Sequence, residues 1–284
     1  MKPEARITNS GFSSIRASFI IRASDFGLEA PLSIVLETKS LTKSFGGLVA
    51  VHDFTLSIAE HELVGLIGPN GAGKTTVFNL ITGMYLPTEG EILFNGADIG
   101  GVKPHRIYQR GIARTFQNIR LFKELSVLDN IRVAHHHRGG AGLLSTVLRG
   151  PGFRREERQV TERAVELLSI FGLEGRRDEL ARSLPYGEQR RVEIARALVS
   201  DPKLLLLDEP AAGMNPFEVG TLMELIRFVR ERFKLTVLLI EHQMKVVMGV
   251  CERVVVMDFG EVIAQGAPEA IQQDPKVIEA YLGK

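Results

Sequence analysis

Short apolar runs, separated by polar or glycine-rich segments, recur from residue 33 to the end of the chain. Such runs are typical of buried strands. We predict strands at Ile34–Leu41, Val51–Ile58, Glu62–Ile67, Glu91–Phe94, Ile112–Phe116, Leu204–Leu207, Thr236–Ile240 and Val254–Met257. The last three are almost wholly apolar, as parallel strands covered on both faces require. The Asn95-Gly96 turn after the fourth run indicates a hairpin, so we also expect an antiparallel layer.

The segments between these runs show the periodicity of helices. We predict helices at Lys74–Thr82, Phe217–Phe233 and Gln243–Val250. One helical face also collects Val160, Ala164, Leu167, Leu168 and Phe171. We therefore predict a helical insertion over about residues 118–185, with a glycine-rich loop at Gly139–Gly152. The whole pattern predicts an α/β fold with a mostly parallel sheet.

Composition narrows the choice of function. The 284 residues are 44% hydrophobic, and 35 Lys and Arg balance 34 Asp and Glu. This balance gives no case for a general nucleic-acid binder, so we expect no nucleic-acid partner. Cys251 is the single cysteine, and an internal disulfide is excluded. No apolar run approaches the roughly 18 residues of a membrane span. If the protein works at a membrane, another chain would have to supply the membrane-spanning segment.

Residues 1–32 have a different character. They are rich in Ser and Arg and follow no clear period. The apolar stretch Phe19-Ile20-Ile21 is too short for the core of a signal peptide. We predict a flexible N-terminal extension here, with a functional arm as the alternative, and one main domain over residues 33–284.

A glycine-rich segment after the third predicted strand carries the first chemical signal. Residues 68–75 read GPNGAGKT and match G-x-x-x-x-G-K-[ST] at every fixed position. Glycines allow backbone N–H groups to turn toward a phosphate, and the following helix N-terminus favours an anion. Lys74 would reach the β- and γ-phosphates, and the Thr75 hydroxyl would bind Mg²⁺.

A phosphate site of this kind also needs a carboxylate at the end of a neighbouring strand. Asp208 and Glu209 follow directly after Leu204–Leu207. Asp208 would hold Mg²⁺, and Glu209 stands where a base or a water-positioning group belongs.

Four further segments resemble the ABC ATPase family. Leu184–Arg191 is similar to the signature that follows the family's helical subdomain. Gln117 resembles the glutamine that joins the core to that subdomain, and His242 resembles the switch histidine. Phe45 stands where the family places an aromatic residue on the adenine. The segments keep the family's order, and the resemblance covers residues 33–284.

The resemblance implies a P-loop NTPase (RecA-like) core with an antiparallel β subdomain and an α-helical ABC-specific subdomain. Its ligands would be ATP and Mg²⁺. Glu209, His242 and Gln117 would be catalytic, and Thr75, Gln117 and Asp208 would hold the metal. The other residues expected at the nucleotide are Phe45, Gly68, Pro69, Asn70, Gly71, Ala72, Gly73, Lys74, Thr75, Thr76, Tyr186, Gly187 and Glu188.

The family also implies a head-to-tail pair of ATPase subunits, with ATP between the phosphate loop of one and the signature of the other. This chain departs from the usual pattern at three positions. Pro185 replaces a serine, Tyr186 replaces a glycine, and Asn215 stands where many relatives carry Asp. Proline is tolerated in a first helical turn, so we expect the signature helix to form.

These departures, with Gly213–Pro216 and the tail Pro275–Gly283, resemble the high-affinity branched-chain amino-acid importers. That resemblance implies a second, different ATPase subunit, two membrane permeases and a periplasmic binding protein. The chain would sit on the cytoplasmic face of the cell membrane and power uptake of leucine, isoleucine and valine. A urea or amide importer and a lipopolysaccharide exporter remain alternatives, and a soluble non-transport ABC ATPase is less favoured.

Overall fold

The computed structural model describes residues 33–135 and 151–282. The predicted N-terminal extension, residues 1–32, lies outside the described residues, as does most of the predicted loop at Gly139–Gly152. Pro151 and Gly152 are described, and they begin helix α5 (Pro151–Ile170), so the loop prediction was wrong at that end.

Six strands form a mostly parallel sheet in the order β10-β9-β3-β8-β7-β6. They are β3 (Leu63–Ile67), β6 (Ile112–Arg114), β7 (Leu204–Asp208), β8 (Thr236–Ile240), β9 (Arg253–Asp258) and β10 (Glu261–Gly266). The pairs from β9 to β6 are parallel, whereas β10 pairs with β9 in the antiparallel sense. Every residue of β3, β7 and β8 is buried, which explains why continuous apolar runs predicted them.

A second, antiparallel sheet has the order β2-β1-β4-β5. Its strands are β1 (Ile34–Phe45), β2 (Leu48–Ala59), β4 (Glu89–Phe94) and β5 (Ala97–Asp98). The predicted ranges were too short, since β1 continues beyond Leu41 and β2 begins before Val51. Register shifts in the β1–β2 pair on either side of Leu41 interrupt the two-residue alternation on which the prediction relied.

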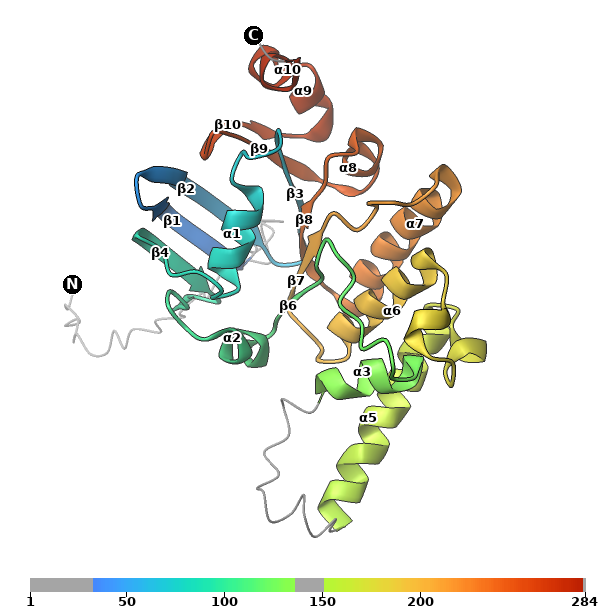
Figure 1. Cartoon of the computed structure of the whole chain (residues 1–284). Helices are drawn as coiled ribbons and strands as arrows, with labels where there is room; N and C mark the ends of the chain where they lie inside the picture. Colours follow the sequence, from blue (N-terminus) through green and yellow to red (C-terminus); the bar gives the residue numbers. More distant parts are fainter. Residues whose placement is uncertain (1–32, 136–150, 283–284) are drawn as a thin grey trace, which may run out of the picture. The chain divides into compact units, whose positions relative to one another are not determined.

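Helix α1 (Lys74–Ile81) packs between the two sheets (Figure 1). Its buried residues Val77, Phe78, Leu80 and Ile81 join one hydrophobic cluster with residues of both sheets, such as Phe54. The helix therefore holds the antiparallel layer against one face of the parallel sheet.

Three helices cover the other face of the parallel sheet: α6 (Tyr186–Leu198), α7 (Pro216–Phe233) and α8 (Met244–Val250). In Figure 1, α1 and α7 lie on opposite sides of β7 and β8. Helix α3 (Val127–His135) and α5 join the same cluster as α6. Of two short 3-10 helices, Ala181–Ser183 buries Ala181, whereas Glu174–Arg176 has no buried residue. The predicted apolar face of Val160, Ala164, Leu167, Leu168 and Phe171 is buried, as expected.

Several elements were not predicted: α2 (Pro104–Arg110), β5, β10, α9 (Pro268–Gln272) and α10 (Pro275–Leu282). Each is short or half-exposed, so its apolar period is weak. Figure 1 shows α9 and α10 beyond β10, next to the C-terminus.

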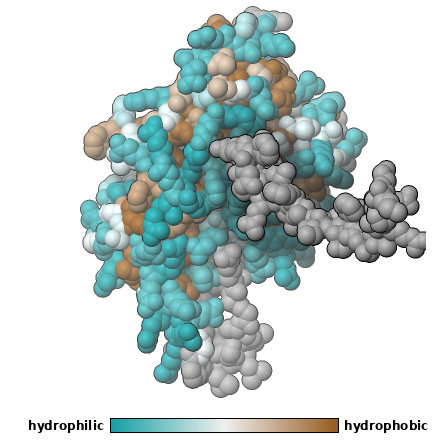
Figure 2. Space-filling model, turned by 180° about the vertical axis from the view of Figure 1, so that it is seen from behind, coloured by the Kyte–Doolittle hydropathy of each residue, from teal (hydrophilic) through white to brown (hydrophobic). Residues whose placement is uncertain are grey.

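Hydrophilic residues cover most of the face seen in Figure 2, where hydrophobic residues form separate small groups. Within residues 33–135 and 151–282, no helix combines the length and the apolar character needed to cross a membrane.

Candidate functional site

The phosphate loop, residues 68–73, joins β3 to α1. Gly68, Gly71 and Gly73 have φ values of 146°, 84° and 100°, a region that favours glycine. A Cβ on Gly68 would lie 2.0 Å from the carbonyl oxygen of Met257, and one on Gly73 would lie 2.5 Å from that of Ala50. Neighbouring backbone therefore excludes a side chain at both positions. The loop and the N-terminus of α1 together can bind an anion at the carboxyl end of β3.

Lys74 opens α1 and turns back onto this loop. Its Nζ donates to the carbonyl oxygens of Gly68 at 2.7 Å and Pro69 at 2.8 Å. An ammonium group has three protons, so one donor remains for a phosphate. Burial lowers the pKa of Lys74, while the charges of Glu209 and Asp208 raise it. Two backbone acceptors thus hold Lys74 against the loop.

Asp208 ends β7 and is held by a residue that the sequence reasoning missed. Nη2 of Arg114 lies 2.7 Å from Oδ2 of Asp208, and the two side chains are only 7% and 5% exposed. Arg114 also donates to Oδ1 of Asn79 on α1, and it contacts the rings of Phe78 and Phe116. The carboxylate therefore has a fixed orientation beside α1.

The three residues predicted as catalytic are brought together around one oxygen. Nε2 of Gln117 donates to Oε2 of Glu209 at 2.7 Å, and Nδ1 of His242 lies 3.7 Å from the same atom. Glu209 has a φ of 44°, an uncommon conformation for a residue with a side chain. Such strain persists where the surrounding structure imposes it, and it gathers at active sites.

Glu241 is a second residue that the sequence reasoning missed. It is fully buried, and its Oε1 accepts from the backbone N–H of Ala211 at 3.0 Å. Its Oε2 accepts from the N–H groups of His242 at 3.0 Å and Gln243 at 3.1 Å. One carboxylate therefore joins the loop after β7 to the loop after β8, and it fixes the backbone that carries His242.

The predicted adenine residue, Phe45, lies at the end of β1. The residue is 42% exposed, and its ring meets the ring of Tyr85 edge to face at 5.1 Å. Nζ of Lys43 lies 4.9 Å from the centroid of Phe45. An exposed aromatic face on the antiparallel sheet is thus available for stacking. The β1–β2 hairpin is next to the phosphate loop, because Ala50 contacts Gly73.

Thr75 and Thr76 lie in the first turn of α1, where Thr75 is exposed and Thr76 is half-buried. Asn70, Gly71 and Ala72 precede them in the phosphate loop. The Thr75 hydroxyl is therefore accessible at the same strand edge as Asp208.

The signature segment forms the start of α6. Pro185 is the N-cap and Tyr186 the first helical residue, so proline leaves this helix intact, as expected. The Tyr186 hydroxyl accepts from Arg190 at 3.2 Å, and its ring packs on Gly213. Glu188 forms ion pairs with Arg176 and Arg191. In the part of the chain that the structure describes, no hydrogen bond or ion pair joins residues 184–189 to residues 68–76.

Arg190, a further residue that the sequence reasoning missed, connects the signature helix to Gln117. It is fully buried, and it donates to the carbonyl oxygens of Phe116 at 2.6 Å and Gln117 at 2.7 Å. It also forms an ion pair of 2.7 Å with Glu193. A charged residue on the buried side of a helix was a signal in the sequence, but its partners were not.

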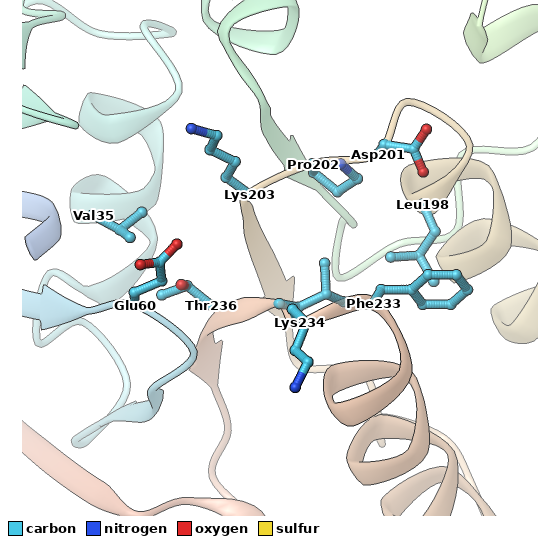
Figure 3. Close-up of a pocket in the computed structure, with 10 residues that line it drawn as sticks. Val35, Glu60, Leu198, Asp201, Pro202, Lys203, Phe233, Lys234 and Thr236 are labelled. Atoms are coloured by element: carbon cyan, nitrogen blue, oxygen red, sulfur yellow. The ribbon is translucent and has the colours of Figure 1, made fainter. Parts of the chain in front are cut away.

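A pocket of about 220 Å³ lies at the other edge of the parallel sheet (Figure 3). Glu60, Lys203 and Thr236, which line it, stand at the amino ends of β3, β7 and β8. Ligands of open parallel sheets bind at the carboxyl ends. This pocket, at the amino ends of the strands, is therefore separate from the phosphate loop, which follows the carboxyl end of β3. In Figure 3 the side chains of Lys203 and Lys234 extend in different directions.

The phosphate loop, the buried lysine and the two strand-end carboxylates belong to one edge of one sheet. This arrangement defines a P-loop nucleoside triphosphatase. The signature helix and the histidine after β8 are the features that resemble the ABC ATPases within this class.

Comparison with known proteins gives the family. Residues 51–212 match the ABC transporter family, and residues 261–284 match the family described as branched-chain amino acid ATP-binding cassette transporter. The chain belongs to the ABC transporter family and is an ABC ATPase.

Curated relatives cover almost the same length. The high-affinity branched-chain amino acid transport ATP-binding proteins BraF of Pseudomonas aeruginosa and LivG of Escherichia coli K12 are each 47% identical over 250 residues. That span is 88% of this chain and 98% of each relative. The lipopolysaccharide export system ATP-binding protein LptB of Haemophilus influenzae is 38% identical over the same share of this chain.

Solved structures agree with the fold. An ATP-binding cassette of an ABC transporter in its ADP conformation has a TM-score of 0.77 and 32% identity, covering 88% of this chain and 99% of that one. A dimeric cassette in a post-hydrolysis state, bound to ADP and Pi, has a TM-score of 0.69 and 26% identity, covering 82% and 98%.

Proposed function

We propose that this ABC ATPase powers an importer of branched-chain amino acids from the cytoplasmic face of the cell membrane. The meeting of Gln117, Glu209 and His242 beside the phosphate loop supports ATP hydrolysis at this site. The substrate class rests on the tail, residues 261–284, and on the relatives that share 47% of their residues with this chain.

The side chains divide the chemistry between binding and hydrolysis. The third N–H of the Lys74 ammonium group would donate a hydrogen bond to the β- and γ-phosphates. The ring of Phe45 would stack on the adenine. Glu209 would take the proton of the attacking water or hold that water in line. The exposed imidazole of His242 would contact both Glu209 and the γ-phosphate.

The side-chain oxygens at the carboxyl ends of the parallel strands are suitable ligands for Mg²⁺. Thr75, Gln117 and Asp208 would offer hydroxyl, amide and carboxylate oxygens, and Mg²⁺ prefers oxygen ligands. Asp208 is oriented by Arg114 through Oδ2. When bound, Mg²⁺ would neutralise charge on the β- and γ-phosphates.

We propose that ATP is shared between two subunits. Residues 184–189 have no hydrogen bond or ion pair to residues 68–76 in the described chain, so the signature does not complete its own phosphate site. Tyr186, Gly187 and Glu188, in the first turn of α6, would instead face the nucleotide of a second, related ATPase subunit. A dimeric cassette among the structural relatives supports this arrangement.

Two permease subunits would hold the pair at the membrane, and a periplasmic binding protein would deliver the substrate to them. A pocket of about 370 Å³ between α2, α3 and α6 suits a short permease helix, because Phe122, Val133 and Tyr108 line it. Cysteines placed at Phe122 or Val133 should cross-link to a permease, whereas one at the exposed Phe228 of α7 should not. The native Cys251 is buried and will not interfere. Cross-linking equal at all three sites would contradict this docking surface.

The deciding experiment is transport by the complete assembly. We expect Lys74→Ala to weaken ATP binding and abolish uptake of leucine, isoleucine and valine, because it removes the mobile cation at the phosphates. Lys203→Ala, in the separate pocket of Figure 3, is the matched control. Uptake of urea or amides in place of these amino acids would overturn the substrate class, as would lipopolysaccharide export. Normal uptake by Lys74→Ala would overturn the site itself.

A further inference from the structure

Gly68, the first residue of the phosphate loop, is held from two directions. Its backbone N–H donates to the hydroxyl of Tyr281 at 2.9 Å. Its carbonyl oxygen accepts from Nζ of Lys74 at 2.7 Å. Tyr281 lies in the last turn of α10, 213 positions along the chain from Gly68. One residue of the loop thus connects the C-terminal helix to the lysine of the phosphate site.

The direction of Lys74 depends on this residue. Two of the three ammonium protons are fixed by the carbonyl oxygens of Gly68 and Pro69, so these carbonyls set the direction of the third. Gly68 has no side chain to anchor it, and its φ of 146° is available to glycine but strained for other residues. A hydrogen bond to its N–H is therefore a direct means of fixing its orientation.

Helix α10, which carries Tyr281, is anchored by one buried side chain and a capped first turn. It packs through Val277, which is buried. Oδ1 of Asp274 accepts from the N–H of Lys276 at 2.8 Å and caps the first turn. Burial raises the pKa of Tyr281, so its hydroxyl stays neutral at physiological pH.

The rest of the helix stands apart from the loop. Residues 69–72 of the loop and Lys276 and Ala280 of α10 line one cavity of about 700 Å³, together with the exposed Phe259. In Figure 1, α10 lies at the same end of the parallel sheet as the loop between β3 and α1. The Tyr281 hydroxyl reaches the loop next to this open space.

We propose that Tyr281 is a positioning residue of the nucleotide site, whose hydroxyl fixes Gly68 and thereby directs Lys74 toward the phosphates. This inference rests on the proposed role of the loop in binding ATP. The C-terminal helix α10 then contributes to the phosphate site, although it is far along the chain from the loop at residues 68–73.

Tyr281→Phe removes one oxygen and keeps the ring. We expect it to weaken ATP binding about two- to tenfold, the range of one hydrogen bond in proteins. Hydrogen exchange at the Gly68 amide should become faster in the nucleotide-free protein. Leu282→Ala is the control, because Leu282 is the neighbouring residue on the same helix and is 81% exposed. It should change neither quantity.

A double-mutant cycle separates positioning from general stabilisation. In the Lys74→Ala background, Tyr281→Phe should change ATP affinity by less than about 1.5-fold, because the group it positions is gone. Affinity is measured there by competition at millimolar ATP. An equal loss in both backgrounds, or unchanged affinity in Tyr281→Phe alone, would overturn the inference. If the unaltered chain bound ATP no better than Lys74→Ala, the proposed function itself would fail, whatever Tyr281 does.

Discussion

Replacing Arg190 by methionine tests whether the signature helix depends on one buried cation. Arg190 is fully buried and donates to the carbonyl oxygens of Phe116 and Gln117 and to Glu193, which is 1% exposed. Removing one partner of a buried ion pair typically costs about 3–5 kcal/mol. Glu193 keeps the N–H of Arg120 at 3.3 Å, so we expect the lower end of that range, about 3 kcal/mol.

The loss should be visible in thermal unfolding. At about 2–4 °C per kcal/mol for a domain of this size, the Tm of Arg190→Met should fall by roughly 6–12 °C. Arg191→Met is the matched control on the same helix. Arg191 is partly exposed and donates to the carbonyl oxygen of Phe171 at 2.7 Å, so its loss should cost about 1 kcal/mol.

The pH dependence follows from Glu193. Burial raises the pKa of its carboxyl group, and the charge of Arg190 opposes that rise. A carboxyl group with a raised pKa in the folded state favours folding when protonated and opposes it as pH rises through that pKa. Without Arg190 the pKa rises further, so the deficit of Arg190→Met should shrink as pH falls. Adding Glu193→Gln should restore part of the stability near pH 8. A loss below about 1 kcal/mol, or a double variant no better than the single one, would refute the reasoning.

Three further outcomes can be checked. Glu209→Gln should still bind ATP but hydrolyse it about 10²–10⁴-fold more slowly, and it should trap a dimer; turnover within about threefold of normal, with the partner's site disabled, would exclude Glu209 as the base. Gly68→Ala should destabilise the chain by more than 2 kcal/mol, roughly, because its Cβ would lie 2.0 Å from the Met257 carbonyl oxygen. For Gly71→Ala, no atom of the described chain beyond the adjacent residues would lie within 4 Å of the added Cβ, so the change should cost only about 1 kcal/mol. Equal losses would contradict the steric argument. Burial raises the pKa of Cys251 to about 12, so alkylation of the folded chain should stay slow at pH 9 and accelerate on unfolding; fast native labelling would show the thiol to be accessible.

Local patterns were enough to predict the centre of the candidate site. Continuous apolar strands followed by glycines or carboxylates are visible in a short window, so the phosphate loop, Asp208 and Glu209 could be proposed directly. Gln117 and His242 needed the family's order of motifs. Helix α2 was missed although Pro104 begins it and Gly111 ends it, both of which are recognised boundary signals.

The residues that hold the site in place could not be predicted in this way. Arg114 pairs with Asp208 across 94 positions, and Tyr281 reaches Gly68 across 213. A hydrogen bond over such a distance depends on the packing of the sheet and its helices, which no short window contains. Asn215 shows the opposite case. Its side chain caps α7 through a capping box with Glu218, so the departure from Asp leaves the helix end fully satisfied.

The left-handed backbone at Glu209 places stability in conflict with the catalytic role that we propose for this residue. Glycine adopts a φ of 44° freely, whereas a residue with a side chain gives up about 1 kcal/mol or more there. A search for heat-resistant variants would therefore favour glycine at this position and, with Glu209 as the proposed base, select against hydrolysis. Thermostability engineering of this ATPase should leave position 209 unchanged and seek its gains elsewhere.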